Sequence, residues 1–302
     1  MRAYGFTALG GPGNETFLDV AAPVAGPGEL LVRVRAAGVN PGDWKLRAGG
    51  YGAVPLPAVL GREVAGTVEA VGDGVRGFEV GNEVFGGTPG MIGGWAELAR
   101  VVASFAAHRP DTVSPADAAT LPVAAGTAYD GLNGLALAPG STLLVNGAGG
   151  GVGVAVVQLA VARGLIVIGT ASPAKHDLVA SLGAVPVAYG AGVVERIDAA
   201  AGGHIDAAFD TVGGQALRTI SALVPDRTRL VTIADRALVA ELGGHGVERD
   251  RSTAVLNALA TLVTDSVLDP LVTDVRPFEE AGRALAAVEA GHSRGKIAIQ
   301  IS

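Results

Sequence analysis

Residues Leu143–Gln158 read LLVNGAGGGVGVAVVQ, with five glycines between positions 147 and 153 and an apolar run on each side. A further apolar run, LIVIGTA (Leu165–Ala171), follows soon after. A glycine turn between a buried strand and a helix lets backbone N–H groups approach a phosphate at the helix N-terminus. The alternative is that the glycines only relieve crowding between strand and helix. The flanking runs favour a dinucleotide-binding βαβ unit.

The spacing of the glycines indicates which residues of the turn would contact the phosphates. A strict G-x-G-x-x-G is absent, because Val152 interrupts it. Gly147, Gly150 and Gly153 recur at three-residue intervals, and A-x-G-x-x-G begins at Ala148. We therefore expect the turn to contact a pyrophosphate through the residues Ala148, Gly149, Gly150, Gly151, Val152 and Gly153.

The sequence pattern before this stretch differs from the pattern that follows it. From 142 to about 262 apolar runs alternate with helical stretches, which predicts a doubly wound parallel sheet of the Rossmann type. The first 120 residues contain short strand-like runs separated by Gly/Pro turns, which favours a β-barrel or sandwich. We predict a cofactor domain over 124–265 and a β-rich catalytic domain over 1–123 and 266–302.

The end of the second predicted strand indicates which dinucleotide binds. NAD-binding units place an acidic residue about 20 positions after the glycines, on the ribose hydroxyls. Here GTASPAKHD has Thr170 and Ser172 at that place, and Lys175 follows. Hydroxyls and an ammonium would hold a 2′-phosphate by charge-assisted hydrogen bonds, so we expect NADPH. A surface lysine and a helix-capping serine are the alternative.

Composition excludes several classes of function. The net charge of −7 disfavours nucleic-acid binding, and the absence of cysteine excludes disulfides and thiolate zinc sites. Polar residues and glycines break the longest apolar tract, and the first residues lack the apolar run of a signal peptide. We expect a cytoplasmic protein with no membrane segment and no metal.

Five stretches, in this order, resemble the medium-chain dehydrogenase/reductase superfamily, and the GVNPGD motif without cysteine resembles its zinc-independent quinone oxidoreductase branch. They are AAGVNPGDWKLRAGGY (36–51), LGREVAGTVEAVGDGVRGFEVGNEVFG (60–86), LPVAAGTAYDGL (121–132), the glycine turn, and GHSRGKIAI (291–299). The resemblance implies an α/β protein: a chaperonin-10-like β-barrel catalytic domain plus a Rossmann cofactor domain. It also implies a homodimer.

Zinc-dependent members of the superfamily give a contrast. Their ligand cysteine and histidine align with Asn40 and Arg62 here, while Glu63 is retained. A third ligand cysteine would fall near 122–124. Without a Lewis acid, reduction of an unactivated carbonyl is disfavoured, so we expect an activated acceptor, a quinone or an α,β-unsaturated carbonyl, which needs less polarisation.

The resemblance also implies roles for single residues. Ser172, Lys175 and Tyr189 would hold the 2′-phosphate, and Thr127 would lie beside the nicotinamide. Tyr51 and Asn40 would be the catalytic pair lining the substrate cleft, although packing and turn roles remain open for them. Further cofactor contacts are expected where the parallel strands end, at Thr170, Thr211, Val212 and Ile233.

The predicted reaction is hydride transfer to a quinone or to the β-carbon of an enone. The resulting oxyanion would accept hydrogen bonds from Asn40, Tyr51 or backbone N–H groups near 231–234, and Tyr51 or water would supply the proton. Other functions remain open: an enoyl-thioester reductase of lipid or polyketide metabolism, or a non-catalytic NADPH-binding protein. Arg47 and Arg62 are candidates to meet an anionic substrate, but we expect them to be solvated or in salt bridges. We expect Asp43 as a helix cap rather than a base, and Lys296 in a structural role rather than a catalytic one.

Overall fold

The computed structural model describes residues 1–291 and 293–302 and contains two compact units. Unit 1 comprises Met1–Val123, Arg251–Asp265 and Pro270–Ser302, and unit 2 comprises Ala124–Asp250 and Ser266–Asp269. The units differ from the predicted domains in two segments: Arg251–Asp265, which contains helix α9 (Thr253–Thr264), belongs to unit 1, and Ser266–Asp269 belongs to unit 2. The functional domain boundaries stay a prediction. His292, in the last quoted motif, lies outside the described residues.

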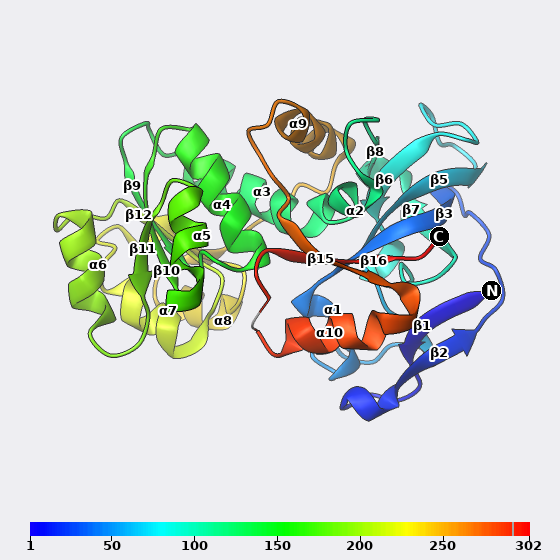
Figure 1. Ribbon diagram of the computed structural model, residues 1–302, viewed down its shortest axis with the longest axis horizontal. Coiled ribbons are helices and arrows are strands. Elements are labelled where there is room, and N and C mark those ends of the chain that lie inside the picture. The colour runs from blue at the N-terminus through cyan, green and yellow to red at the C-terminus, as the bar shows by residue number, and fades with distance from the viewer. Residues whose placement is uncertain (292) are drawn as a thin grey trace. The chain divides into compact units, whose positions relative to one another are not determined.

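Unit 1 is built on two β-sheets (Figure 1). The larger has the order β15-β16-β3-β5-β6-β8, with β7 also paired to β3. Its strands are β3 (Glu29–Val39), β5 (Glu63–Val71), β6 (Glu83–Gly87), β7 (Leu98–Val102), β8 (Ala106–His108), β15 (Val272–Pro277) and β16 (Lys296–Gln300). The smaller sheet has the order β2-β1-β4, formed by β1 (Arg2–Phe6), β2 (Glu15–Asp19) and β4 (Ala58–Val59).

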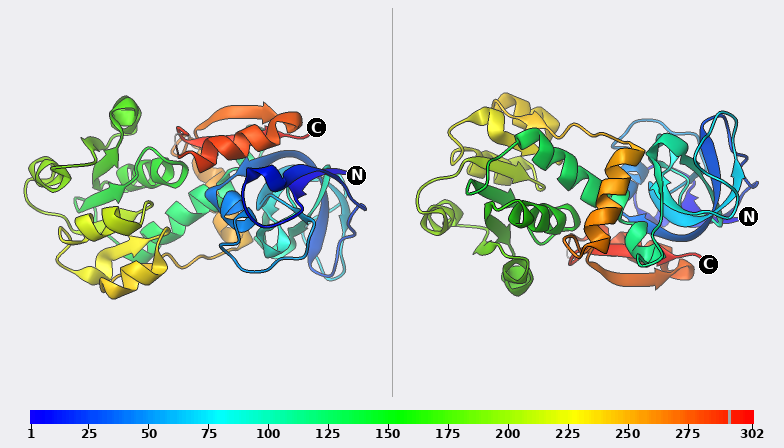
Figure 2. Two further views of the ribbon diagram at one scale, coloured as in Figure 1. Left: turned by 90° about the horizontal axis from the view of Figure 1, so that it is seen from below. Right: turned by 90° about the horizontal axis from the view of Figure 1, so that it is seen from above.

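The helices of unit 1 are α1 (Pro41–Arg47), α2 (Pro115–Ala118), α9 and α10 (Ala281–Glu289). Ser114 caps α2, because its hydroxyl accepts a hydrogen bond from the Asp117 backbone N–H at 3.1 Å. Helix α10 lies along β15 and β16, as both views in Figure 2 show. It buries Leu285 and Val288 in the barrel core.

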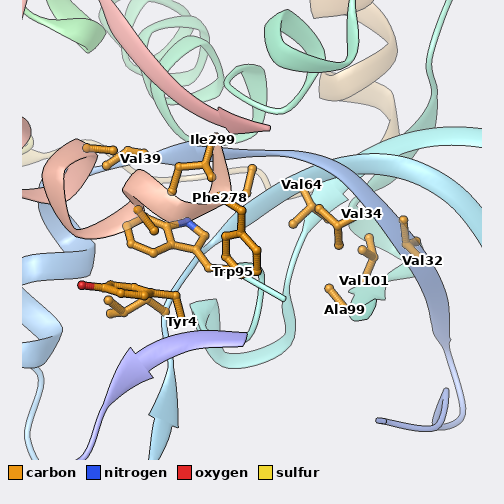
Figure 3. Packing of buried hydrophobic residues seen from close by; sticks show 14 of the residues in the cluster. Tyr4, Val32, Val34, Val39, Val64, Trp95, Ala99, Val101, Phe278 and Ile299 are labelled. Carbon is orange, nitrogen blue, oxygen red and sulfur yellow. The ribbon is translucent and has the colours of Figure 1, made fainter. Parts of the chain in front are cut away.

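The core of unit 1 combines aromatic and β-branched side chains (Figure 3). Trp95 is fully buried, and its indole N–H donates to the Gly38 carbonyl at 3.2 Å. Phe17 packs edge-on against both Tyr4 and Phe278. Strand β3, which belongs to the sheet over this core, ends at Val39, and Asn40 follows as the residue that caps α1.

Unit 2 is a six-stranded parallel sheet with the order β11-β10-β9-β12-β13-β14. Its strands are β9 (Thr142–Asn146), β10 (Ile166–Ala171), β11 (Val185–Ala188), β12 (Ala207–Asp210), β13 (Leu230–Thr232) and β14 (His245–Gly246). Strand order reverses beside β9, so a crevice is expected at the carboxyl ends of β9 and β12.

Helices cover both faces of this sheet, with α4 and α5 on one face and α7 and α8 on the other (Figure 2). The helices of unit 2 are α3 (Gly126–Leu135), α4 (Gly151–Ala162), α5 (His176–Ser181), α6 (Val193–Ala201), α7 (Gly214–Ser221) and α8 (Arg236–Glu241). The predicted combination of a β-barrel domain and a doubly wound parallel sheet is confirmed. Because the strands of unit 2 are parallel, their carboxyl ends lie at the same end of the sheet. Most of the candidate cofactor residues follow these strand ends.

Candidate functional site

The glycine turn between β9 and α4 is shaped to leave room for a ligand. Gly147 has φ +85°, a left-handed conformation that favours glycine. A Cβ on Gly153 would lie 2.2 Å from the Gly147 carbonyl oxygen, so helix and turn approach each other too closely for a side chain. The first amides of α4 lack acceptors within the helix. The turn therefore fits the pyrophosphate of a dinucleotide.

Thr170 supports the turn. Its hydroxyl donates to Asn146 Oδ1 at 2.7 Å and accepts from the Gly147 backbone N–H at 3.0 Å, and the residue is buried. The Ala148 N–H donates to the Thr170 carbonyl at 2.9 Å. The hydroxyl predicted to replace the acidic residue of NAD-binding proteins is thus engaged inside the protein.

The remaining candidates for the 2′-phosphate lie just beyond the ends of two neighbouring strands. Ser172 follows β10 and precedes a short 3-10 turn that ends at Lys175. A Cβ on Gly149 would lie 2.7 Å from Lys175 Cδ, so the lysine stem passes directly over the glycine turn. Tyr189 follows β11 and is 64% exposed. No acidic residue occupies the end of β10, since Ala171 is followed by Ser172 and Pro173.

At the strand-order reversal, Asp210 organises the ends of three strands. Its carboxylate accepts from Asn146 Nδ2 at 2.7 Å, Thr232 Oγ1 at 2.5 Å and the Gly213 N–H at 3.0 Å. Asp210 thereby holds the loop that leads into α7. Asp210 therefore joins the ends of β9, β12 and β13, and sequence reasoning did not select it as a site residue.

The three candidates beside Asp210 differ in their surroundings. Thr211 donates to the Asn146 carbonyl at 2.8 Å, and the Ile233 N–H donates to the Asp210 carbonyl at 3.0 Å. Val212 is 54% exposed at the loop tip. The structure thus places Thr211, Val212 and Ile233 around the end of β12.

Thr127 lies in the first turn of α3 within a charged cluster. Arg249 donates from Nη1 to Thr127 Oγ1 at 2.8 Å and from Nε to Asp130 Oδ2 at 2.7 Å. Asp130 Oδ2 also accepts from the Asp250 N–H at 3.0 Å. Sequence reasoning missed Arg249, because it stands 122 residues from Thr127 and outside every quoted motif.

In unit 1, Asn40 is the centre of a buried network. Its Nδ2 donates to Glu63 Oε1 at 2.7 Å, and its Oδ1 accepts from Lys296 Nζ at 2.6 Å. Lys296 also pairs with Glu63 Oε1 at 3.2 Å, and all three residues are buried. The expected structural role of Lys296 agrees with these contacts.

Tyr51, the second catalytic candidate, lies beside Arg62, which in turn lies near Asp43. It is 55% exposed, and the Arg62 guanidinium stands over its ring at 4.7 Å from the centroid. Asp43 accepts from the Asn40 N–H at 2.9 Å, which is the expected capping role. Burial raises the pKa of Asp43 to about 6, and the Arg62 charge 3.7 Å away partly opposes this rise. Arg47 is engaged in buried salt bridges, as expected.

The superfamily includes zinc enzymes, but the residues at the aligned position do not fit a zinc ion. Asn40 and Arg62 stand where cysteine and histidine would bind the metal, and the Lys296 ammonium already supplies a cation between Asn40 and Glu63. Zinc prefers thiolate, imidazole and carboxylate donors. Within 1–291 and 293–302, no three His, Cys, Asp or Glu side chains converge as metal ligands do.

Among these same residues, no helix combines the length and apolar character needed to cross a membrane.

The model of the alcohol dehydrogenase GroES-like domain matches residues 26–111, and that of the zinc-binding dehydrogenase domain matches residues 182–299. The chain is 30% identical to 2-methylene-furan-3-one reductase of Solanum lycopersicum, over 99% of this chain and 79% of that protein.

Two solved structures are similar over the full length of this chain. The quinone oxidoreductase from Coxiella burnetii has a TM-score of 0.90 at 28% identity, with 99% of its chain covered. A mycobacterial protein complexed with NADPH has a TM-score of 0.89 at 29% identity, with 100% of its chain covered. The glycine turn, the two sheets and these similarities together show that the chain belongs to the medium-chain dehydrogenase/reductase superfamily of oxidoreductases, in its quinone oxidoreductase branch.

Proposed function

We propose that the protein is an NADPH-dependent, zinc-independent reductase of quinones or α,β-unsaturated carbonyls. The observation that carries the cofactor preference is the Lys175 stem over Gly149, at a strand end with no acidic residue. An ammonium near the ribose stabilises a 2′-phosphate, whereas a carboxylate there would repel it. The names of the tomato and Coxiella relatives, a furanone reductase and a quinone oxidoreductase, support the acceptor class.

Unit 2 would hold the cofactor through groups along one edge of its sheet. The amides of the glycine turn bind the pyrophosphate, and Ser172, Lys175 and Tyr189 bind the 2′-phosphate. Thr127, Thr211, Val212 and Ile233 contact the remainder of the dinucleotide. Thr170 contributes by fixing the conformation of the turn through Gly147. When bound, NADPH supplies the hydride.

Unit 1 would act on the acceptor. The β-carbon of an enone would take up the hydride, the π pair of the C=C bond would form a new double bond between the α-carbon and the carbonyl carbon, and the C=O π pair would move onto the oxygen. The resulting enolate would then be protonated at the α-carbon. Asn40 Nδ2 donates a hydrogen bond to the developing oxyanion, which stabilises the transition state. Tyr51, exposed at 55%, supplies the proton or positions the water that does.

Steady-state oxidation of NADPH and of NADH across a panel of quinones, enones, enoyl thioesters and simple ketones tests the proposal. We expect turnover with quinones or enones, with NADPH preferred, and none with simple ketones. Turnover confined to enoyl thioesters would favour the thioester reductase instead. Tight NADPH binding without any turnover would indicate a non-catalytic protein.

We also propose a homodimer that works in the cytoplasm. Light scattering during size-exclusion chromatography measures the mass of the protein in solution, and a mass equal to one chain would refute the homodimer.

A further inference from the structure

Asn40, Glu63 and Lys296 meet because of strand register. In the large sheet of unit 1, β16 and β5 flank β3 on either side. Ile297 pairs with Val39, and Val64 pairs with Ala37, so Lys296 and Glu63 stand at the same end of the sheet as Asn40. Three side chains from three separate segments thus converge at the point where β3 turns into α1.

The network permits one orientation of the Asn40 carboxamide. Lys296 can only donate, so the atom 2.6 Å from its Nζ must be the amide oxygen. A carboxylate can only accept, so the atom 2.7 Å from Glu63 Oε1 must be the amide nitrogen. A flip of the amide would set donor against donor and acceptor against acceptor in a buried place, which is costly.

Glu63 is itself held from two sides. Its Oε2 accepts from the Val123 backbone N–H at 2.6 Å, while Oε1 accepts from Asn40 and Lys296. A Cβ on Gly38 would lie 2.2 Å from Glu63 Oε1, so β3 needs glycine there for the carboxylate to fit. Lys296 is anchored as well, because its Nζ donates to the Val39 carbonyl at 3.1 Å.

We propose that Glu63 and Lys296 are positioning residues that fix the Asn40 amide for catalysis. The amide nitrogen carries two hydrogens, and one is bonded to Glu63. In the part of the chain that the structure describes, the second has no acceptor, and the network fixes its direction. It is the hydrogen that donates to the oxyanion of the reduced acceptor. This inference rests on the proposed function for its catalytic consequence, but the orientation of the amide can be measured separately.

The first test is kinetic. Glu63→Gln keeps the shape but is uncharged and has one acceptor end where the carboxylate uses two. With its oxygen toward Val123 it would set its NH₂ against the Asn40 NH₂ and Lys296, and with its oxygen toward Asn40 it would offer only a weaker, uncharged acceptor, so the Asn40 amide is held less firmly in either case. We expect kcat to fall about 10-fold or more, in line with the loss of an oriented oxyanion donor. The dissociation constant of NADPH should stay unchanged. Glu83→Gln, which removes a carboxylate bound to Thr67 and Arg109 in the neighbouring strand, is the matched control and should keep wild-type kcat.

A double-mutant cycle distinguishes a role of Glu63 and Lys296 in positioning Asn40 from a general effect on the structure. Asn40→Ala removes the amide, so Glu63→Gln should cause no further loss of kcat in that background. Lys296→Met should behave in the same way. Losses that multiply in the double variants would show that Glu63 and Lys296 act independently of Asn40 and would overturn the inference.

The second test needs no turnover. The Asn40 side-chain NH₂ signals in a ¹⁵N–¹H spectrum are assigned by their loss in Asn40→Ala. Glu63→Gln should move the proton bonded to the carboxylate upfield, while Glu83→Gln leaves it in place. Unchanged Asn40 signals in Glu63→Gln would overturn the inference even if the wild type reduces quinones. A wild type that reduces no member of the panel would refute the proposed function and leave the spectrum to decide the orientation.

Discussion

Replacing Gly153 by alanine tests whether the close approach of α4 to the glycine turn matters. The new Cβ would lie 2.2 Å from the Gly147 carbonyl oxygen and 2.8 Å from two backbone atoms of Ala148. These are backbone atoms on a turn that Thr170 holds in place, so no flexible side chain can move aside. Ordinary contact begins at 3.4 Å, so either the turn or the helix must shift by about 1 Å.

The expected cost follows from two opposing effects. Overpacking of a tight interior costs about 1–3 kcal/mol. Alanine in place of glycine inside a helix gains up to about 1 kcal/mol. We therefore expect a net loss of about 1–2 kcal/mol in the free energy of unfolding. The displaced turn should also weaken NADPH binding by about 10-fold, equivalent to about 1.4 kcal/mol.

Urea unfolding and NADPH fluorescence titration measure both quantities. Gly134→Ala is the matched control, because Gly134 is an exposed position of α3 where a Cβ would meet nothing within 4 Å. It should stabilise the protein by up to about 1 kcal/mol and leave the NADPH affinity unchanged. If Gly153→Ala matched this control in both assays, the turn would be free to relax. The argument that the close approach of α4 to the glycine turn requires glycine at position 153 would then be refuted.

Three further predictions concern charged residues. Lys175→Ala should weaken NADPH binding by about 10- to 100-fold and leave NADH unaffected, because only the 2′-phosphate loses a charged partner; an equal loss for both coenzymes, measured by fluorescence titration, would contradict the assignment. Asp43 has its pKa raised from 3.8 to about 6, so its contribution to stability is present below pH 3.8 and is lost as the pH rises through about 6. The unfolding free energy of the wild type minus that of Asp43→Asn should fall by about 3 kcal/mol over this interval, and parallel pH profiles would disprove it. Arg249→Leu leaves the nearly buried Asp130 carboxylate without its guanidinium, so urea unfolding should show a loss of about 3 kcal/mol; a loss below about 1 kcal/mol would contradict this.

Sequence alone determined the architecture, because the signals that set it are local. The alternation of apolar runs and helical stretches after 142, and the glycines at 147, 150 and 153, depend on neighbouring residues only. Short runs between Gly/Pro turns likewise indicated the β-rich unit. The fold class could therefore be predicted from these patterns and is confirmed. The superfamily was predicted from the resemblance of five motifs and is confirmed by the comparisons. The individual candidate site residues and the domain boundaries stay predictions.

The tertiary structure decided which side chains meet. Asn40 contacts Lys296 across 256 residues and Arg249 contacts Thr127 across 122, because strand order and register bring distant segments together. No local pattern contains that information. Thr170 is a second example. Its position in the sequence indicated a ligand of the 2′-phosphate, but only the structure shows that its hydroxyl is hydrogen-bonded to Asn146 inside the protein, where it supports the glycine turn. Side-chain chemistry can be read from sequence, but a hydrogen-bond partner depends on where folding places the neighbouring strand.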